Sequence, residues 1–356
     1  MKVLALTIKP NLSPDTRYRI YQYIDFFKKQ EIYVDHLSLL NERFFLWHQE
    51  QGNTLLKILF YMFFLFKRII QILILVPKYD VIWILRELSP IGPPWLEKLV
   101  FGLHSKVILD IDDAIFLKDK ASSSFIHRYL RDFTKFEDIA KRFSTVVCGN
   151  RFLADYFNKL GAKVEVIPTV VSYEKYSKIK RNPSSHVRIG WIGTPTNRVH
   201  FQVVKDVFHK LIKEVNFELI IIGLNKPLDW NLENITYLPW ELSKELDYFS
   251  LFDIGIMPLL DFEFAKGKCA FKIIQYMAAG IPVIASPIGA NVEVIQDGLN
   301  GFLAKDDREW ILKMKRLICD QELREKMGSH GRKTVKNFYS LEKQGRRYVH
   351  IFRKIN

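Results

Sequence analysis

Short apolar runs rich in β-branched residues alternate with longer segments of helical periodicity along the whole chain. This alternation is typical of parallel sheets whose strands are joined by helices. Strands are predicted over ten runs, which are residues 2–8, 80–85, 106–111, 145–149 and 164–170, and then 187–193, 217–223, 235–240, 253–259 and 282–288. The expected fold class is therefore α/β, with two doubly wound, Rossmann-like units.

The chain has 356 residues, which is more than a single hydrophobic core usually supports. A polar and basic stretch, residues 174–186, separates the two sets of strands and is predicted to link two domains. We expect an N-terminal domain over residues 1–180 and a C-terminal domain over residues 181–340. Residues 341–356 have the pattern of a basic amphipathic helix that packs back toward the N-terminal domain. Sheets of this kind bind ligands at the carboxyl ends of their strands, so two facing domains would enclose a cleft.

The formal net charge of +14 favours an anionic partner, which could be nucleic acid, acidic lipid or a phosphorylated small molecule. No basic stripe interleaved with aromatic residues accompanies this charge, so we expect no nucleic-acid partner. The three cysteines are far apart and form no CxxC pair, which indicates neither a disulfide framework nor a thiolate metal site. The N-terminal apolar run reads as a strand rather than an export signal, so the predicted location is cytoplasmic.

Residues 54–76 are predicted to form one amphipathic helix. Its longest unbroken apolar run, residues 58–66, is too short to span a bilayer. Lys57, Lys67, Arg68 and Gln71 fall within an arc of about 100°, which leaves a wide apolar face. Two interpretations stay open. The helix packs on its own domain, or it docks on an anionic membrane surface at the inner face of the membrane.

The second half opens with a strand, a glycine turn and a predicted helix start, residues 188–201. Gly193 would let the backbone approach a ligand closely, and Thr194 or Thr196 could cap the helix. Exposed N–H groups at such a turn favour a phosphate, and Arg198 could add a mobile cation. An ordinary turn in an α/β core would also fit this pattern.

A second segment of interest, residues 267–289, reads GKCAFKIIQYMAAGIPVIASPIG. Lys268, Lys272, Gln275 and Tyr276 are spaced by three or four residues, so a helix would place them on one side. Gly267 precedes them, and the AAG turn closes the helix onto a strand. A pair of cations with a neighbouring amide suits a pyrophosphate and a sugar hydroxyl, although lysines on an apolar helix also commonly form its solvent face.

Residues 252–304 resemble the donor-nucleotide region of the GT-B glycosyltransferases of family 4, and the weaker matches RIGWIGTPTN, ITYLPW, LDIDDAIF and CGNRFLADYF lie outside that block. The resemblance implies retaining transfer of a sugar from a nucleotide diphosphate-sugar, with no catalytic metal and no cofactor. It assigns Lys272 and Arg198 to the leaving diphosphate. It also implies donor contacts for the glycine-turn and helix residues already described, which are Gly193, Thr194, Gly267, Lys268, Lys272 and Gln275.

The chain departs from the family pattern at two positions. The family's E-x7-E motif places carboxylates where this chain has Gly267 and Gln275. Gln275 could still bind ribose hydroxyls, and Lys268 could replace a lost contact to the sugar or phosphate. The departure leaves the identity of the donor in doubt more than the fold.

In the first half, LDIDDAIF sets Asp110, Asp112 and Asp113 at the end of a buried strand, and the family places groups near the donor sugar there. Asp112 and Asp113 are the candidates for this role. We expect these carboxylates to position the sugar or acceptor and to stabilise positive charge that develops at the transferred sugar. The alternatives are a strand-end Asp that caps the next helix, a D-x-D metal site of the GT-A type and a dehalogenase-like phosphatase loop. Arg17 and Arg19 follow the first strand and are candidates for binding an anionic acceptor, although they could also be an ordinary solvated helix start.

Together these features predict a GT-B glycosyltransferase that uses a nucleotide diphosphate-sugar. The acceptor class that the resemblance implies is a glycan or a lipid-linked molecule of surface polysaccharide or lipopolysaccharide synthesis. The alternative is a non-catalytic or membrane-docked protein of the same fold that keeps the nucleotide-sugar pocket, because the E-x7-E pattern is lost.

Overall fold

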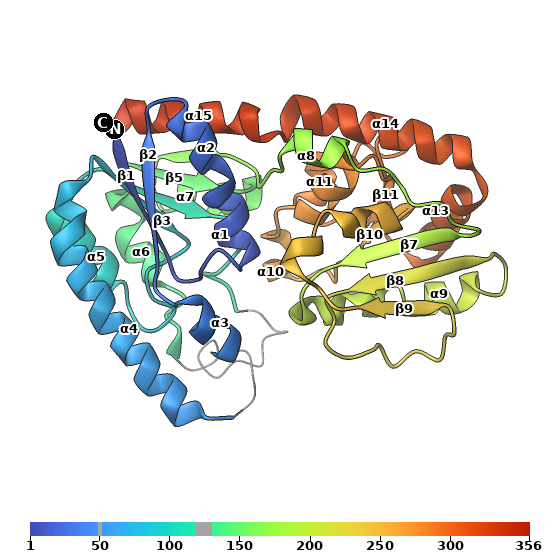
Figure 1. The fold of residues 1–356 in the computed structure, drawn as a ribbon, viewed down its shortest axis with the longest axis horizontal. Helices are drawn as coiled ribbons and strands as arrows, with labels where there is room; N and C mark the ends of the chain where they lie inside the picture. Colours follow the sequence, from blue (N-terminus) through green and yellow to red (C-terminus); the bar gives the residue numbers. More distant parts are fainter. Residues whose placement is uncertain (49–51, 119–129) are drawn as a thin grey trace. The chain divides into compact units, whose positions relative to one another are not determined.

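The computed structural model describes residues 1–48, 52–118 and 130–356 (Figure 1). The chain divides into two compact units. Met1–Thr169 together with Leu341–Asn356 form the first unit, and Val170–Ser340 form the second. The second unit begins before the predicted residue 181, because part of the expected linker packs within it. Tyr176, in helix α8 (Tyr173–Ser177), is buried, and its hydroxyl accepts a hydrogen bond from Gln275 Nε2 at 2.8 Å.

The first unit is built on a parallel six-stranded sheet in the order β2-β1-β3-β4-β5-β6. Its strands are β1 (Lys2–Thr7), β2 (Tyr33–Ser38), β3 (Val81–Leu85), β4 (Val107–Ile111), β5 (Thr145–Cys148) and β6 (Val164–Val166). The α-helices are α1 (Pro14–Arg19), α2 (Ile24–Lys28), α3 (Glu42–His48), α4 (Thr54–Leu75), α5 (Trp95–Leu103), α6 (Lys135–Ile139), α7 (Arg151–Lys159) and α15 (Leu341–Ile355).

The second unit repeats this plan, with a parallel sheet in the order β12-β11-β10-β7-β8-β9. Its strands are β7 (Val187–Ile192), β8 (Phe217–Ile222), β9 (Ile235–Leu238), β10 (Ile254–Met257), β11 (Val283–Ala285) and β12 (Phe302–Leu303). Besides α8, its α-helices are α9 (Lys205–Leu211), α10 (Glu263–Lys266), α11 (Phe271–Ala278), α12 (Asn291–Val294), α13 (Asp307–Cys319) and α14 (Gln321–Phe338). The predicted α/β class is confirmed, and the prediction missed two strands, β2 and β12.

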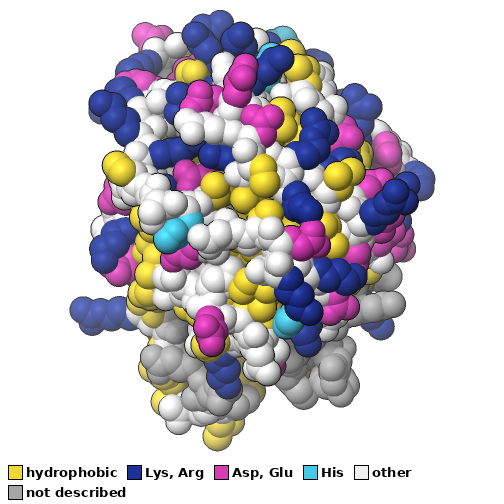
Figure 2. All heavy atoms as spheres, turned by 90° about the vertical axis from the view of Figure 1, so that its right-hand side faces the viewer, with side chains coloured by type: hydrophobic (Ala, Val, Ile, Leu, Met, Phe, Trp, Pro, Cys, Tyr) yellow, Lys and Arg dark blue, Asp and Glu magenta, His cyan; other side chains and the backbone are white. Residues whose placement is uncertain are grey.

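Positive and negative side chains are mixed on the face of the molecule that Figure 2 presents. Lys and Arg groups there lie among Asp and Glu groups and single apolar side chains, so the cations form no continuous basic stripe on that face. On this face the Lys and Arg side chains are therefore dispersed among side chains of the opposite charge.

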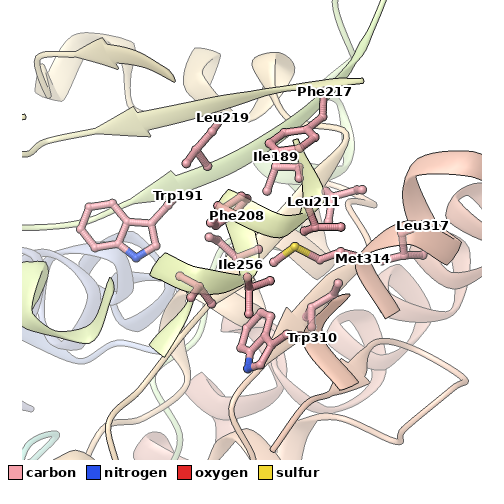
Figure 3. Packing of buried hydrophobic residues seen from close by; sticks show 14 of the residues in the cluster. Ile189, Trp191, Phe208, Leu211, Phe217, Leu219, Ile256, Trp310, Met314 and Leu317 are labelled. Atoms are coloured by element: carbon pink, nitrogen blue, oxygen red, sulfur yellow. The ribbon is translucent and has the colours of Figure 1, made fainter. Parts of the chain in front are cut away.

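Apolar side chains fill one face of the second sheet (Figure 3). Trp191 and Ile256 from the strands pack with Phe208 of α9 and with Trp310 and Met314 of α13. Burial of such large side chains is the main favourable contribution to folding.

The other face of this sheet is shaped by two glycines in its strands. A Cβ atom at Gly190 would lie 2.0 Å from the ring of Phe252, and one at Gly255 would lie 2.5 Å from the ring of Tyr276. The absence of side chains there lets helix α11 lie close against the sheet. The Tyr276 hydroxyl then reaches the end of β7 and accepts a hydrogen bond from the Ile192 N–H at 3.3 Å.

The first unit has a buried ion pair at its centre. Arg19 and Asp110 are both fully buried, and Arg19 Nη2 lies 2.6 Å from Asp110 Oδ1. The hydroxyl of Tyr348 in α15 donates to Asp110 Oδ2 at 2.6 Å, and Trp83 Nε1 donates to the same oxygen at 3.2 Å. The prediction that Arg19 binds an acceptor is wrong, because its guanidinium is fully buried and paired with Asp110. The ion pair and the Tyr348 bond instead join α1, β4 and the C-terminal helix.

Candidate functional site

The order of strands in the second unit reverses between β7 and β10. The chain proceeds outward from β7 through β8 and β9, and then returns to β10 on the opposite side of β7. In open parallel sheets the loops part at such a point, and ligands bind there at the carboxyl ends of the strands. The two segments singled out by sequence, after β7 and before α11, both lie at this edge.

Gly193 ends β7 and packs tightly. A Cβ atom at this position would lie 2.6 Å from the ring of Trp191 and 2.9 Å from Lys272 Cε. Its own N–H donates to the Ile222 carbonyl of β8 at 3.0 Å, so this group is not available to a phosphate. The value of Gly193 to the site is therefore the space it leaves for the stem of Lys272, rather than a backbone donor.

Thr194 occupies the N-cap position of a 3-10 helix, Pro195–Val203, but its side chain makes no capping hydrogen bond. Its hydroxyl instead pairs with Thr196 Oγ1 at 2.9 Å and accepts from Asn197 Nδ2 at 2.9 Å. The predicted cap by a threonine is wrong, because these hydroxyls bind each other and Asn197. Thr194 remains exposed at the edge of the sheet.

Lys272 lies in the first turn of α11 and is half-buried. Its ammonium lies 5.2 Å from the centre of the Trp191 ring, a cation–π distance. Within the described part of the chain no carboxylate forms a salt bridge with it. Burial, and then the nearby charge of Lys268, lower its pKa from 10.5 to about 7. Such a cation is stabilised by any anion that enters the site.

Lys268 reaches the same place from the loop before α11. The left-handed conformation of Ala270, φ +51°, marks the start of α11 at Phe271, so Lys268 is not on the helix as predicted. Its ammonium donates to Asn197 Oδ1 at 3.2 Å and lies 5.6 Å from the ring centre of Phe264. Lys268 thus bridges the loop before α11 and the loop after β7.

His200 lies beneath these lysines. It is buried, its ring stacks on Phe262 with centroids 5.6 Å apart, and its Nδ1 accepts from the Leu260 N–H at 3.2 Å. Burial and the charges of Lys268 and Lys272 lower its pKa to about 3. His200 is therefore neutral at physiological pH and acts here as a fixed support for the loop after β10.

The remaining donor-site candidates on this segment do not share the side of Lys272. Gln275 is buried and bonds Tyr176, while Tyr276 is fully buried against the sheet. Gly267 caps the C-terminal end of α10 with a right-handed backbone. The prediction of one shared polar side is wrong, because α11 turns Gln275 and Tyr276 toward the interior of the second unit.

Arg198 is one turn further along the same 3-10 helix. Its Nη1 donates to the Lys226 carbonyl at 2.6 Å, and its Nη2 lies 3.6 Å from Asp229 Oδ1. Asp229 is fully exposed, so this pair is weakly held and a bound anion can compete for the guanidinium. The assignment of Arg198 to the leaving diphosphate stays a prediction.

The first unit has its own reversal of strand order, between β1 and β3. Arg86 follows β3 there with φ +63°, a strained conformation for a residue other than glycine. Its guanidinium meets three carboxylates. The nitrogen–oxygen distances are 2.5 Å to Asp112, 3.2 Å to Asp15 and 3.8 Å to Asp113. Arg86 therefore fixes the two aspartates that the sequence singled out, and their role toward a sugar stays a prediction.

Asp15 carries a charge in this cluster despite its burial. Burial raises the pKa of the carboxyl, but the cations of Lys9 and Arg86 outweigh it and lower the pKa below its usual range. Lys9 Nζ lies 3.1 Å from Asp15 Oδ2. A cavity of about 270 Å³ adjoins the cluster and is lined by polar and apolar groups, among them Lys9, Asp15, Arg86, Tyr61 and Phe45.

Arg17 does not line this cavity. Its Nη1 donates to the carbonyls of Leu12 at 3.1 Å and Asn11 at 3.4 Å, and so orders the loop between β1 and α1. An additional contact to an anionic acceptor stays a prediction.

Among the described residues, no group of three or more His, Cys, Asp or Glu side chains is arranged to hold a metal ion. The D-x-D alternatives also lose one member, because Asp110 is committed to the buried pair with Arg19. Asp112 instead faces Arg86. A D-x-D metal site or a phosphatase loop would need both carboxylates to face one ligand.

Sequence reasoning missed Trp191 and Arg86. Trp191 was counted as a strand residue, although its ring is the surface over which Lys272 lies. Arg86 follows the strand that was predicted over residues 80–85 and stands at a carboxyl end, where a charged residue could have been noticed. Its contacts to carboxylates 26 or more residues away along the chain had no local signal.

Parts of the chain are similar in sequence to known glycosyltransferases. Residues 186–320 match the family described as Glycosyl transferases group 1. The chain is 30% identical over 191 residues to Glucosyltransferase 3 of Streptococcus parasanguinis, which covers 49% of this chain and 57% of that protein. It is 24% identical over 211 residues to the putative teichuronic acid biosynthesis glycosyltransferase TuaH of Bacillus subtilis, which covers 53% of this chain and 52% of that protein. The chain thus spans about half the length of these curated relatives.

Among solved structures, Anabaena Alr3699/HepE in complex with UDP and glucose has a TM-score of 0.69 at 14% identity, over 99% of this chain and 100% of that one. The architecture is that of the GT-B glycosyltransferases, with two Rossmann-like domains. The segment that matches this family lies in the second unit, and Gly193, Lys268 and Lys272 are all within it.

Proposed function

We propose that the protein is a glycosyltransferase that moves a sugar from a nucleotide diphosphate-sugar to a glycan or lipid-linked acceptor. The observation that carries this proposal is Lys272, a half-buried cation without a carboxylate partner in the described chain, at the strand reversal of a Rossmann-like sheet. A diphosphate supplies the missing charge. The relatives give further support, since one is named a glucosyltransferase and one structural neighbour binds UDP and glucose.

In the proposed reaction the acceptor oxygen bonds to the anomeric carbon of the sugar, and the bond from that carbon to the diphosphate oxygen breaks. The proton of the acceptor hydroxyl passes to a donor phosphate oxygen, and the configuration is retained. Lys272 and Lys268 neutralise the charge that grows on the leaving diphosphate, which is usually a large catalytic contribution. Gly193 holds open the space for the Lys272 stem. The proposed reaction needs no metal, because these cations stabilise the leaving group.

The acceptor class follows from the kinds of relative rather than from a contact. The proposed acceptor is a molecule of surface polysaccharide or lipopolysaccharide synthesis, and the polysaccharide alternative is supported by the one relative that is named for teichuronic acid biosynthesis. The cavity beside Arg86 is where we propose that the acceptor binds. Asp112 and Asp113 are the proposed carboxylates for positioning it.

The test is a panel of nucleotide diphosphate-sugars, scored for slow hydrolysis and for thermal stabilisation of the protein. Turnover of one donor supports the transferase. Binding without turnover supports the alternative, a non-catalytic nucleotide-sugar-binding protein, which the lost carboxylates at Gly267 and Gln275 favour. A protein that neither binds nor turns over any member of the panel would overturn both.

Lys272→Ala is the decisive variant. It should lower turnover by at least about tenfold to a hundredfold, the scale of losing one contact to a developing charge. Lys333→Ala is the matched control, because Lys333 is an exposed lysine in the middle of α14. Equal activity in the two variants would remove Lys272 from the site.

A further inference from the structure

Helix α4 concentrates exposed apolar surface. Of the 22 large apolar side chains exposed in the described parts of the chain, 11 belong to this one helix. We call them the α4 outer face, and they are Leu55, Leu56, Ile58, Leu59, Phe60, Met62, Phe63, Phe66, Ile70, Leu73 and Ile74. Single exposed apolar residues need no explanation, but a contiguous patch of this kind marks an interaction surface.

The opposite side of α4 is anchored to the first unit. A narrow stripe spaced like one helix face is buried, and it consists of Tyr61, Phe64, Leu65, Arg68 and Ile72. The Arg68 guanidinium donates through Nη2 to the carbonyls of Thr7 at 2.8 Å and Leu37 at 3.1 Å, at the ends of β1 and β2. Arg68 thus ties α4 to the sheet.

This anchoring decides how α4 can meet a membrane. In the described residues one helix, Leu55–Lys78, is long and apolar enough to cross a bilayer, with a mean hydropathy of 2.1. A crossing helix would have to leave the first unit, which would break the Arg68 bonds to β1 and β2 and expose the buried stripe. A helix that stays in place can insert only its outer face.

The charges around the outer face are all of one sign. Between residues 51 and 79 the chain has no Asp or Glu, and besides the buried Arg68 it has Lys57, Lys67 and Lys78. Lys57 lies 5.4 Å from the ring centre of the half-buried Trp47, and Lys67 and Lys78 are exposed. Lysines with long apolar stems, beside a tryptophan, are suited to the boundary between lipid tails and headgroups.

We propose that the α4 outer face docks the protein onto a membrane surface that carries anionic lipids, with α4 lying in the plane of the interface. A second copy of the chain fits this face less well. A symmetric pair would bring the same cations toward one another, whereas anionic headgroups neutralise them. The proposal is independent of the transferase reaction, since it concerns where the first unit is held.

Co-sedimentation with vesicles tests the docking. The full chain is mixed with vesicles of phosphatidylcholine alone and of phosphatidylcholine with about one-third phosphatidylglycerol, at low and high salt. We expect binding to the anionic vesicles that weakens as salt rises, because headgroup attraction is screened. Leu59→Ser, Phe63→Ser and Phe66→Ser combined should lower the partition coefficient at least about tenfold by removing inserted apolar surface.

The matched control combines Leu299→Ser, Leu312→Ser and Phe338→Ser, which are exposed apolar side chains of the second unit. It should bind like the unmodified protein. Lys67→Glu tests the charge separately and should weaken binding only to the anionic vesicles. Equal binding to neutral vesicles, or an equal loss in the control, would overturn the proposal. A dimer by light scattering that the α4 variant dissociates, without vesicle binding, would overturn it in favour of a second copy.

Discussion

The affinity of the protein for a nucleoside diphosphate is expected to fall as the pH rises from 7 to 9. The pKa of Lys272 is about 7, lowered by burial and by Lys268. A bound diphosphate supplies a negative charge and raises this pKa again. The free protein therefore loses the proton at a lower pH than the complex does, and binding takes up a proton in the interval between the two pKa values.

The size of the effect follows from the pKa of the free protein. In the free protein the protonated fraction of Lys272 falls from about one half at pH 7 to about one hundredth at pH 9. If the complex keeps its proton up to pH 9, the dissociation constant rises roughly 50-fold over that range. At pH 8, binding should take up about nine-tenths of a proton. The terminal phosphate of UDP contributes little, because its second ionisation is complete by about pH 7, with a pKa near 6 like that of a phosphate ester.

Isothermal titration calorimetry with UDP at pH 7, 8 and 9 measures this directly. Two buffers with different ionisation enthalpies give the number of protons taken up at each pH. Lys272→Arg is the control, because a guanidinium keeps its charge throughout this range and the dissociation constant should change little. An affinity of the unmodified protein that does not vary with pH, or a fall that persists in Lys272→Arg, would refute the reasoning.

Four further outcomes are expected. Gly193→Ala should weaken UDP binding at least about tenfold by calorimetry, because its Cβ would meet both the Trp191 ring and the Lys272 stem that lies over it, and a misplaced charged contact costs about this much. Asp110→Asn should lower the free energy of unfolding by about 3–5 kcal/mol in urea titrations, since it leaves Arg19 buried without its counter-ion. Lys268→Gln should move the pH at which UDP affinity begins to fall upward, because it removes the charge that lowers the pKa of Lys272. Turnover should be unchanged by EDTA, since the proposed reaction uses no metal.

Two control variants are matched to the first two of these predictions. Gly102→Ala places a methyl group where no atom lies within 4 Å, so it should leave UDP affinity unchanged. Asp229→Asn removes an exposed carboxylate and should change stability by less than about 1 kcal/mol. If Gly102→Ala weakens UDP binding as much as Gly193→Ala does, crowding of Lys272 does not explain the loss of affinity. If Asp229→Asn lowers the free energy of unfolding as much as Asp110→Asn does, burial of the Arg19–Asp110 pair does not explain the loss of stability. If the affinity of Lys268→Gln for UDP begins to fall at the same pH as that of the unmodified protein, the third prediction fails. Inhibition by EDTA that Mg²⁺ reverses would contradict the fourth.

The sequence predicted the central strands of both sheets and missed a strand at the edge of each. Central parallel strands are covered on both faces and read as continuous apolar runs. Strand β2 is an edge strand with no fully buried residue and the polar sequence YVDHLS, and the edge strand β12 has only two residues. Neither has enough apolar length to stand out from a loop.

Residue types at the candidate site were predictable, but the direction of their side chains was not. Spacing placed Lys268 and Gln275 on one side of a helix with Lys272. The helix begins only at Phe271, after a left-handed Ala270, so the spacing from Lys268 carries no helical meaning. Gln275 turns inward because Tyr176, about 100 residues earlier in the chain, provides a buried partner for its amide. Such pairings over long sequence distances leave no local pattern.

The lowered pKa of Lys272 accords with its lack of a carboxylate partner in the described chain. The resembling family has acidic residues where this chain has Gly267 and Gln275, and a carboxylate at Gly267 would add negative charge next to Lys268 in the chain. Here burial and the repulsion from Lys268 act on Lys272 without that compensation. In the empty site Lys268 and Lys272 therefore repel each other. An entering diphosphate would relieve more of this repulsion than it would in a site that already held a carboxylate. The pH dependence of UDP affinity is therefore the measurement that tests this charge balance most directly.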